Sequence, residues 1–402
     1  MKRTTLVLTL FLVLVLTLSL ISCDKLNFNK GKAPETTEAP EPNPEDANLG
    51  NPEYSSNYTE GLVFELTNEG YEYSVSGYTG TNAAVVIPRI YKGYPITSVK
   101  NFAFKDNTIL TSVTIPDTVT SIGYSAFFNC SALTSINIPD SVTFIGIYAF
   151  SRCLSLTTVE IPGSVKSLGT CAFKECTSLT SVTIHSGVTY IPFTAFKDCT
   201  SLTSINIPDS VSSIGDAAFS GCTSLTGISI PSGVSRIGFL TFYQCSALTN
   251  VTIPESVTYI DDYAFQDCTA LTDITVPSSV KAIGYAAFSG CTALKNVTLT
   301  DGLASIDEFT FNNCTALTNI TVPDSVIYID VAAFKNCTAL TSVTLPAQTS
   351  ALCEYTFSGC SALTSINFKG SKVQWNMIHK EDNWDKNTGI YTVYCSDGNI
   401  SK

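Results

Sequence analysis

The stretch Ala126-Phe127-Phe128-Asn129-Cys130-Ser131-Ala132-Leu133-Thr134-Ser135-Ile136-Asn137-Ile138-Pro139 returns along the chain, with small changes, at a fixed step of 23 residues. We use Phe127 as the marker of each repeat. The marker recurs without a slip in spacing as Phe104, Phe127, Phe150, Phe173, Phe196, Phe219, Phe242, Phe265, Phe288, Phe311, Phe334 and Phe357. A strict period of this length predicts a solenoid in which each repeat forms one coil.

Each repeat carries a set of apolar residues that we expect to face inward. Leu133 follows the marker by six residues, and the alternating pair Ile136 and Ile138 predicts a short strand. Pro139 ends this strand, because proline lacks the N–H that a ladder requires. One coil alone cannot bury the set, whereas stacked coils bury it continuously. At about 4.8 Å per coil, twelve coils would extend for about 55 to 60 Å.

The pattern Leu-x-x-Ile-x-Ile-Pro-x-x-Val-x-x-Ile-Gly-x-x-Ala-Phe-x-x-Cys, from Leu133 to Cys153, resembles the BspA-like (treponemal) leucine-rich repeat of bacterial surface proteins. The flanks, residues 61–88 and 370–398, also resemble the opening and closing segments of that family. The resemblance implies short parallel strands on one face, turns and short helical segments elsewhere, and a cap at each end. It also implies adhesins or host-protein binders as relatives, with no shared catalytic residues.

The N-terminus predicts a signal peptide over residues 1–22. A basic start, Met1-Lys2-Arg3, precedes an apolar run of sixteen residues, which is short for a membrane span. The run ends in Leu20-Ile21-Ser22-Cys23, which resembles the bacterial lipobox. In that interpretation Cys23 becomes the first mature residue and carries the lipid that holds the protein on a membrane. An ordinary cleaved signal peptide and an uncleaved anchor remain as alternatives.

The rest of the chain divides into four predicted parts. Residues 23–60 are acidic and rich in proline, and we expect a disordered tether, with a partner-binding acidic tail as the alternative. Residues 61–100 are expected to cap the first coil, residues 101–367 to form the solenoid, and residues 368–402 to cap the other end. A calcium loop at Asn383-Asp385-Asn387 is disfavoured, because Tyr394 stands where a twelfth-position acid is needed.

Eleven of the fifteen cysteines recur three residues after a marker, from Cys130 to Cys360, and Asn107 takes the place in the first coil. We expect a ladder of buried free thiols, each bonded to a turn carbonyl as Asn107 would be. Isolated disulfides are an alternative, as is a metal site, although a linear ladder does not assemble tetrahedral ligands. Cys171, Cys353 and Cys395 lie off the ladder.

Composition argues against nucleic-acid binding and catalysis. The net charge is −12, and no basic stripe is visible to attract phosphates. Only two histidines occur, and His185 replaces the proline that usually ends the strand, so we interpret it as a surface substitution. Nothing predicts a cofactor or a metal ion. We therefore do not expect an enzyme.

Two outward rows are candidates for binding. The main strand presents hydroxyl and amide residues, which suit stacked strands and solubility. The position before the second inward isoleucine is usually Ser or Ala but is aromatic in four coils, at Phe144, Tyr190, Tyr259 and Tyr328. These four are our candidate anchors, because exposed aromatic residues are typical of interfaces. They could instead cover a neighbouring turn.

From the sequence we expect a monomeric, lipid-anchored protein on the outside of the cell membrane or outer membrane. Its solenoid would bind extracellular or host proteins, or proteins of neighbouring cells. The alternative is a structural spacer lipoprotein without a dedicated ligand, because the outward positions are rather uniform.

Overall fold

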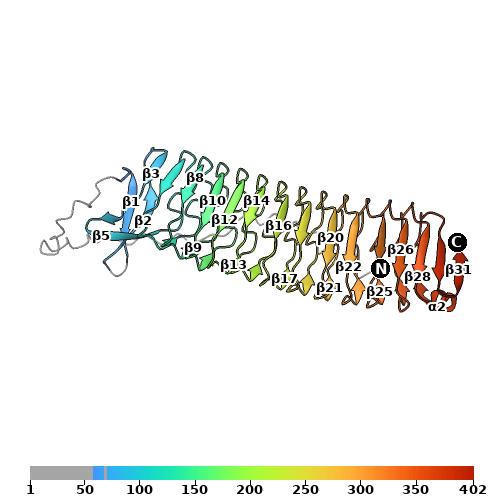
Figure 1. Cartoon of the computed structure of the whole chain (residues 1–402). Helices are drawn as coiled ribbons and strands as arrows, with labels where there is room; N and C mark the ends of the chain where they lie inside the picture. The colour runs from blue at the N-terminus through green and yellow to red at the C-terminus, as the bar shows by residue number, and fades with distance from the viewer. Residues whose placement is uncertain (1–57, 68–69) are drawn as a thin grey trace. The chain divides into compact units, whose positions relative to one another are not determined.

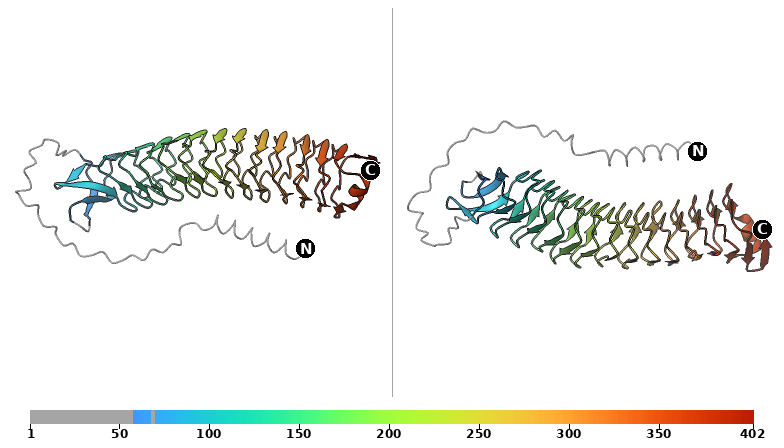
Figure 2. Two further views of the ribbon diagram at one scale, coloured as in Figure 1. Left: turned by 60° about the horizontal axis from the view of Figure 1, so that its bottom comes forward. Right: turned by 90° about the horizontal axis from the view of Figure 1, so that it is seen from above.

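The computed structural model describes residues 58–67 and 70–402. In this region the 23-residue repeats form coils that stack one after another, with almost no helix (Figures 1 and 2). The predicted leucine-rich-repeat solenoid is therefore confirmed. The predicted signal peptide, Cys23 and most of the tether lie outside the described residues. No helix among the described residues is long and apolar enough to cross a membrane.

The predicted strand of each repeat forms a main row of parallel strands. Neighbouring strands pair 23 residues apart, as in Thr158↔Ser181 and Ile161↔Ile184, so equivalent side chains lie side by side. Their burial alternates, with the apolar residues inside. The strands of the main row are β3 (Ala84–Val86), β6 (Ser112–Thr114), β8 (Ser135–Asn137), β10 (Thr158–Ile161), β12 (Ser181–Ile184), β14 (Ser204–Asn206), β16 (Gly227–Ser229), β18 (Asn250–Thr252), β20 (Asp273–Val276), β22 (Asn296–Leu299), β24 (Asn319–Thr321), β26 (Ser342–Leu345), β28 (Ser365–Phe368) and β30 (Thr392–Cys395).

A second row of parallel strands, which the sequence did not predict, runs along the coils. Most of its strands have only two residues, and in every two-residue strand except the last the second residue is an inward isoleucine or leucine. The strands of this second row are β5 (Tyr94–Val99), β7 (Ser121–Ile122), β9 (Phe144–Ile145), β11 (Ser167–Leu168), β13 (Tyr190–Ile191), β15 (Ser213–Ile214), β17 (Arg236–Ile237), β19 (Tyr259–Ile260), β21 (Ala282–Ile283), β23 (Ser305–Ile306), β25 (Tyr328–Ile329), β27 (Ala351–Leu352) and β29 (His379–Lys380).

The segment around each marker is a turn, so the short helical segments implied by the resemblance are wrong for the coils. Two residues of each turn, such as Ser125 and Asn129, have φ near +51° and +57°. Left-handed residues between right-handed ones direct N–H groups toward the next coil. Phe127 N accordingly donates to Ala149 O at 2.8 Å, and this bond recurs from coil to coil. The turns thus form a third line of hydrogen bonds between coils.

The twelve marker phenylalanines form a continuous stack through the core. All are at most 2% exposed, and successive ring centroids lie 5.0–5.7 Å apart, with nearly parallel planes. This stack is possible because strict repetition places each ring directly beside its equivalent in the next coil.

The cysteine ladder is confirmed as a set of buried free thiols, and the other three described cysteines are free as well. Each ladder thiol donates to the carbonyl of the marker in the preceding coil, as Cys130 Sγ does to Phe104 O at 3.0 Å and Cys245 Sγ does to Phe219 O at 3.2 Å. Asn107 differs from our prediction. Its side-chain oxygen accepts from Leu110 N at 3.0 Å, so it closes its own turn instead of donating to a carbonyl.

Both ends are closed by segments that also extend the rows. Strands β1 (Leu62–Leu66) and β2 (Tyr73–Tyr78) form an antiparallel hairpin, and β2 pairs in parallel with β5. β4 (Ile90–Tyr91) pairs with the start of β5. Because β3 and β5 already pair with coil strands, stacking begins within the predicted cap at residues 61–100.

The closing segment interrupts the period with α2 (Lys372–Met377), which begins at a capping box formed by Ser371 and Gln374. Trp384 covers Phe357, the last ring of the stack, at 6.2 Å. β31 (Gly398–Ser401) then pairs antiparallel with β30. The Asp385 carboxylate of the disfavoured calcium loop accepts from Tyr391 Oη and pairs with Lys402 Nζ, each at 2.7 Å.

In six coils a glycine stands four residues before the marker, and its close approach to the neighbouring coil gives a testable prediction. A Cβ on Gly146 would lie 2.5 Å from the backbone carbon of Gly123 and from Tyr124 N, and neither atom can move without shifting the coil. We expect Gly146→Ala to lower the free energy of unfolding by about 2 kcal/mol, measured by urea denaturation. At the equivalent Gly238 the nearest atom is a side-chain oxygen of Asp216, so we expect Gly238→Ala to lower the free energy of unfolding clearly less. Equal losses of stability in the two variants would contradict this explanation.

Candidate binding surfaces

The four predicted anchors all lie in the second row of strands, where each is the first residue of a two-residue strand. Tyr190 and Tyr328 are 43% and 54% exposed, whereas Phe144 and Tyr259 are half-buried. The anchors are two or three coils apart, and smaller or polar residues separate them. Tyr328, for example, pairs with Ser305 on one side and Ala351 on the other. The structure therefore aligns the anchors without bringing them into contact.

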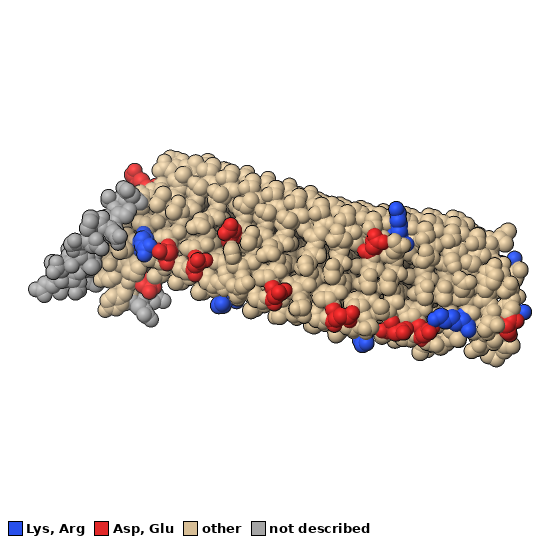
Figure 3. Space-filling view, viewed as in Figure 1, with Lys and Arg blue, Asp and Glu red and all other residues tan. Residues whose placement is uncertain are grey.

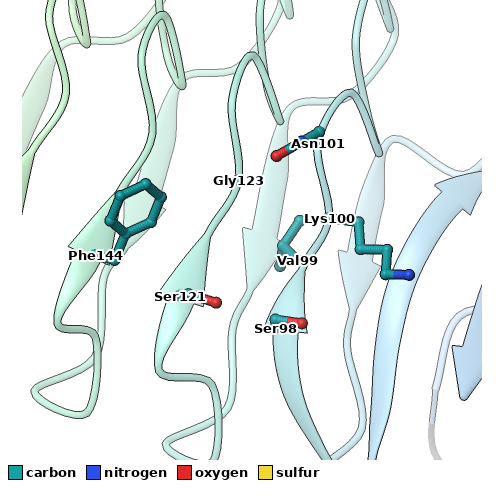
Figure 4. A pocket seen from close by; sticks show the side chains of 7 residues that line it. All are labelled: Ser98, Val99, Lys100, Asn101, Ser121, Gly123 and Phe144. Atoms are coloured by element: carbon teal, nitrogen blue, oxygen red, sulfur yellow. The ribbon is translucent and has the colours of Figure 1, made fainter. Parts of the chain in front are cut away.

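An open depression of about 390 Å³ lies beside Phe144 (Figure 4). Its floor includes Ser98 and Ser121, the neighbours of Phe144 in the second row, and Lys100 lies at its far side. The Phe144 ring also contacts Tyr124 edge-on, with centroids 5.8 Å apart. Phe144 thus partly covers a neighbouring turn, as the alternative prediction proposed, and also forms one wall of a site large enough for a side chain.

The surface that varies most between coils lies next to the second row. We call it the variable edge, defined as the residues two, three and four positions before each marker. In its first half four large apolar residues are exposed: Phe102, Tyr124, Ile147 and Phe193 are 41–49% exposed. We call these four residues the apolar patch; Tyr124 contacts Phe144 beside the depression, and Thr170 separates Ile147 from Phe193 along the edge. Exposed apolar patches of this kind are typical of interaction sites.

The second half of the variable edge combines aromatic rings with carboxylates. Four half-buried rings follow one another with centroids 5.2–5.9 Å apart, in the order Phe239, Tyr263, Tyr285 and Phe309. Carboxylates alternate with them along the same edge: Asp216, Asp261, Asp262, Asp307, Glu308 and Asp330. In Figure 3, acidic side chains lie along the lower edge of the molecule, the edge that carries β17, β21 and β25 in Figure 1.

Some of these carboxylates have a structural role. Asp262 Oδ1 accepts from Tyr285 N in the next coil at 2.8 Å, and Asp216 Oδ1 accepts from Phe239 N at 3.0 Å. Even so, burial raises the pKa of Asp262, and the nearby charges of Asp261 and Asp307 add to the rise. Burial likewise raises the pKa of Glu308, with further contributions from Asp330 and Asp307. The negative charge at this edge is therefore only partly compensated.

The outward face of the main row is polar and regular. The residue before each of these strands is usually threonine, and its hydroxyl bonds the carbonyl of the equivalent residue in the preceding coil, as Thr134 Oγ1 does to Thr111 O at 3.1 Å and Thr180 Oγ1 does to Thr157 O at 3.0 Å. These bordering hydroxyls are used within the solenoid. The outward strand residues are mostly Ser, Thr and Asn along the row, so this face offers few groups that would prefer one ligand to another.

The described residues contain no cluster of three or more His, Cys, Asp or Glu side chains able to hold a metal ion. His185 is exposed, as expected for a surface substitution, and its Nε2 lies 3.6 Å from a carboxylate oxygen of Glu160. This pair stands on the regular polar face and not in a cavity.

Sequence reasoning missed the variable edge. A signal was present, because aligned repeats differ most at these positions: the residue three before the marker is Tyr124, Ile147, Phe193, Asp262 or Glu308 in different coils. The contacts between the rings were not predictable, because they join residues 22 or 24 apart instead of 23.

Comparison with known proteins identifies the family. A model described as "BspA type Leucine rich repeat region (6 copies)" matches residues 97–222, 189–306 and 283–380, which together exceed half of the chain. A search of curated proteins found no significant match.

Among solved structures, the chain resembles a leucine rich cell surface protein from Faecalibacterium prausnitzii A2-165, with 32% identity over 81% of this chain and 98% of that one and a TM-score of 0.53. It also resembles a leucine-rich repeat protein from Bacteroides ovatus, with 29% identity over 84% and 100% of the two chains and a TM-score of 0.62. The pneumococcal vaccine antigen PcpA shares the fold, with 21% identity over 79% and 88% and a TM-score of 0.54. The chain belongs to the BspA-type leucine-rich repeat family.

Proposed function

We propose that this protein is a non-enzymatic cell-surface lipoprotein whose solenoid binds other proteins, with adhesion to host or neighbouring-cell proteins as its role. The observation that carries the proposal is the apolar patch in the first half of the variable edge, where Phe102, Tyr124, Ile147 and Phe193 are exposed on one edge and Tyr124 contacts Phe144 beside the depression. Monomeric soluble proteins seldom expose such a group of large apolar side chains without a partner.

The cellular location is part of the same proposal. The apolar run before Cys23 and the lipobox-like sequence support export and lipid attachment at Cys23. The relative from Faecalibacterium prausnitzii is described as a cell surface protein, which supports an extracytoplasmic location for this chain. The acidic residues 23–60 would then separate the solenoid from the membrane.

Binding is tested first with extracellular-matrix proteins, mucins and neighbouring bacterial cells at physiological salt. For a protein ligand that binds saturably, we expect the triple variant Tyr124→Ala, Phe144→Ala, Phe193→Ala to weaken binding at least about 30-fold, because aromatic anchors contribute about 2 kcal/mol or more each. The control is Tyr71→Ala with Tyr394→Ala, two exposed aromatic residues in the caps, which should leave affinity within twofold.

The predicted anchors of the second row are tested separately by replacing Phe144, Tyr190, Tyr259 and Tyr328 with alanine. If this variant binds as the unchanged protein does, the four residues are not anchors, and the apolar patch remains the candidate site. Because Phe144 is also changed in the triple variant, Phe144→Ala is tested alone as well. Failure of every ligand to bind would favour the structural spacer instead. The regular polar face of the main row supports that second candidate, because its outward residues differ little between coils and the threonine hydroxyls that border it are already bonded between coils.

A further inference from the structure

The second half of the variable edge has a regular chemical alternation. Three residues before successive markers stand Asp216, Phe239, Asp262, Tyr285 and Glu308, so carboxylates and rings alternate coil by coil. Successive coils here are 5.2–5.7 Å apart, as the marker rings show. Carboxylates therefore recur every roughly 11 Å with an aromatic ring between them, a spacing that one extended or helical segment of a partner can follow.

The chain itself supplies a cation to only part of this surface. The Arg236 guanidinium lies against Asp261 and within 3.7 Å of Asp216, beside the first ring of the row. Among residues 58–67 and 70–402, no lysine or arginine comes within ion-pair distance of Asp262, Asp307, Glu308 or Asp330. The same pair of acidic positions recurs as Asp262 and Asp307, two coils on, where Ala282 takes the place of Arg236.

Cations do stack on rings elsewhere along the same edge. Lys105 Nζ lies 5.7 Å from the ring centroids of both Phe102 and Phe128, and Lys335 Nζ lies 5.2 Å from that of Tyr355. Such contacts are favourable because the ring face is electron-rich, and arginine makes them best while also pairing with carboxylates.

We propose that the second half of the variable edge binds a cationic segment of a partner protein, with its arginine or lysine groups stacked on Tyr263 and Tyr285 and paired with Asp307, Glu308 and Asp330. This inference rests on the proposed function and specifies the chemistry of one partner. Charge complementarity favours a cationic segment as the partner. An anionic segment or an anionic membrane would be repelled by the carboxylates, and an apolar segment would bury the carboxylates without giving them a partner.

The test uses a nonapeptide of arginine and its glutamate counterpart, titrated into the purified protein at about 0.15 M salt. We expect saturable binding of the arginine peptide and none of the glutamate peptide. The variant Asp307→Asn, Glu308→Gln, Asp330→Asn should weaken binding about tenfold or more. The matched control, Asp140→Asn, Asp209→Asn, Glu255→Gln, makes the same change of net charge at three exposed turns and should change affinity less than twofold.

The rings are tested with Tyr263→Leu plus Tyr285→Leu, which keep apolar volume but remove the π faces; we expect affinity to fall about fivefold or more. The control is Tyr71→Leu plus Tyr394→Leu, two exposed tyrosines in the caps, which should leave binding unchanged. Equal weakening by both carboxylate variants would mean non-specific attraction to an acidic protein and would overturn the proposal. If the arginine peptide does not bind while a protein ligand of the apolar patch still does, this inference is contradicted and the proposed function is not.

Discussion

Raising the pH from 8 to 10 is expected to destabilise the solenoid by at least about 4 kcal/mol. Burial raises the pKa of the ladder thiols from 9.0, to about 12 at Cys130, Cys176 and Cys245. Burial also raises the thiol pKa well above its ordinary value at seven further positions: Cys153, Cys199, Cys222, Cys268, Cys291, Cys314 and Cys337. The cause is that a thiolate inside the stack would lose its hydration.

The sign of the effect follows from proton binding. In the folded state the thiols keep their protons, whereas in the unfolded chain they release them above pH 9.0. Their contribution to the free energy of unfolding is therefore fully present below pH 9.0 and is lost as the pH rises toward 12. At pH 10 each of the three thiols with a pKa of about 12 would contribute about 1.4 kcal/mol of destabilisation, which is about 4 kcal/mol together, and the other seven add to the loss. The three alone amount to a large part of the stability of many proteins, about 5–15 kcal/mol.

The measurement is urea denaturation followed by circular dichroism at pH 7.5, 8.5, 9.5 and 10, with a phosphine reductant to prevent oxidation. The control is Cys222→Ala with Cys245→Ala, which removes two of the ten titrating groups and should make the loss above pH 9 shallower by about one fifth. A denaturation midpoint that stays constant up to pH 10 would show that the ladder thiols do not couple to unfolding.

Phe219→Ala is expected to lower the free energy of unfolding by about 3–5 kcal/mol. The Phe219 ring is fully buried and lies between Phe196 and Phe242, each 5.7 Å away. Its loss leaves a cavity in the middle of the stack, and rings held on both sides by their own coils cannot collapse into it. Because each coil contacts only its neighbours, the defect should also separate unfolding of the two halves.

Phe193→Ala provides the matched control, because Phe193 lies on the variable edge three residues before a marker and is 42% exposed. We expect it to cost less than about 1 kcal/mol in the same urea titration. If the two alanine variants were equally destabilised, the phenylalanine stack would not be the main source of stability.

The sequence by itself determined the coil and its core. Phe127, Cys130, Leu133 and Ile136 could be assigned inward because one coil cannot bury them, while twelve identical coils can. Turns between the strands were expected, but the short helical segments implied by the resemblance were wrong for the coils. The frequent Asn, Asp and Gly two residues after the marker, such as Asn129, are the signal of the left-handed conformation that excludes a helix there. The second row was missed since two residues, as in Ser121–Ile122, are too short to show alternation.

Only the tertiary structure decided which outward residues form a surface. Phe144, Tyr190, Tyr259 and Tyr328 share one position in the repeat, yet intervening coils keep them apart. The rings from Phe239 to Phe309 occupy two different positions of the repeat, yet they touch. The physical reason is that the left-handed turn directs a side chain across the boundary between coils. Periodicity therefore determines what is buried, whereas the path of the turn determines which exposed groups meet.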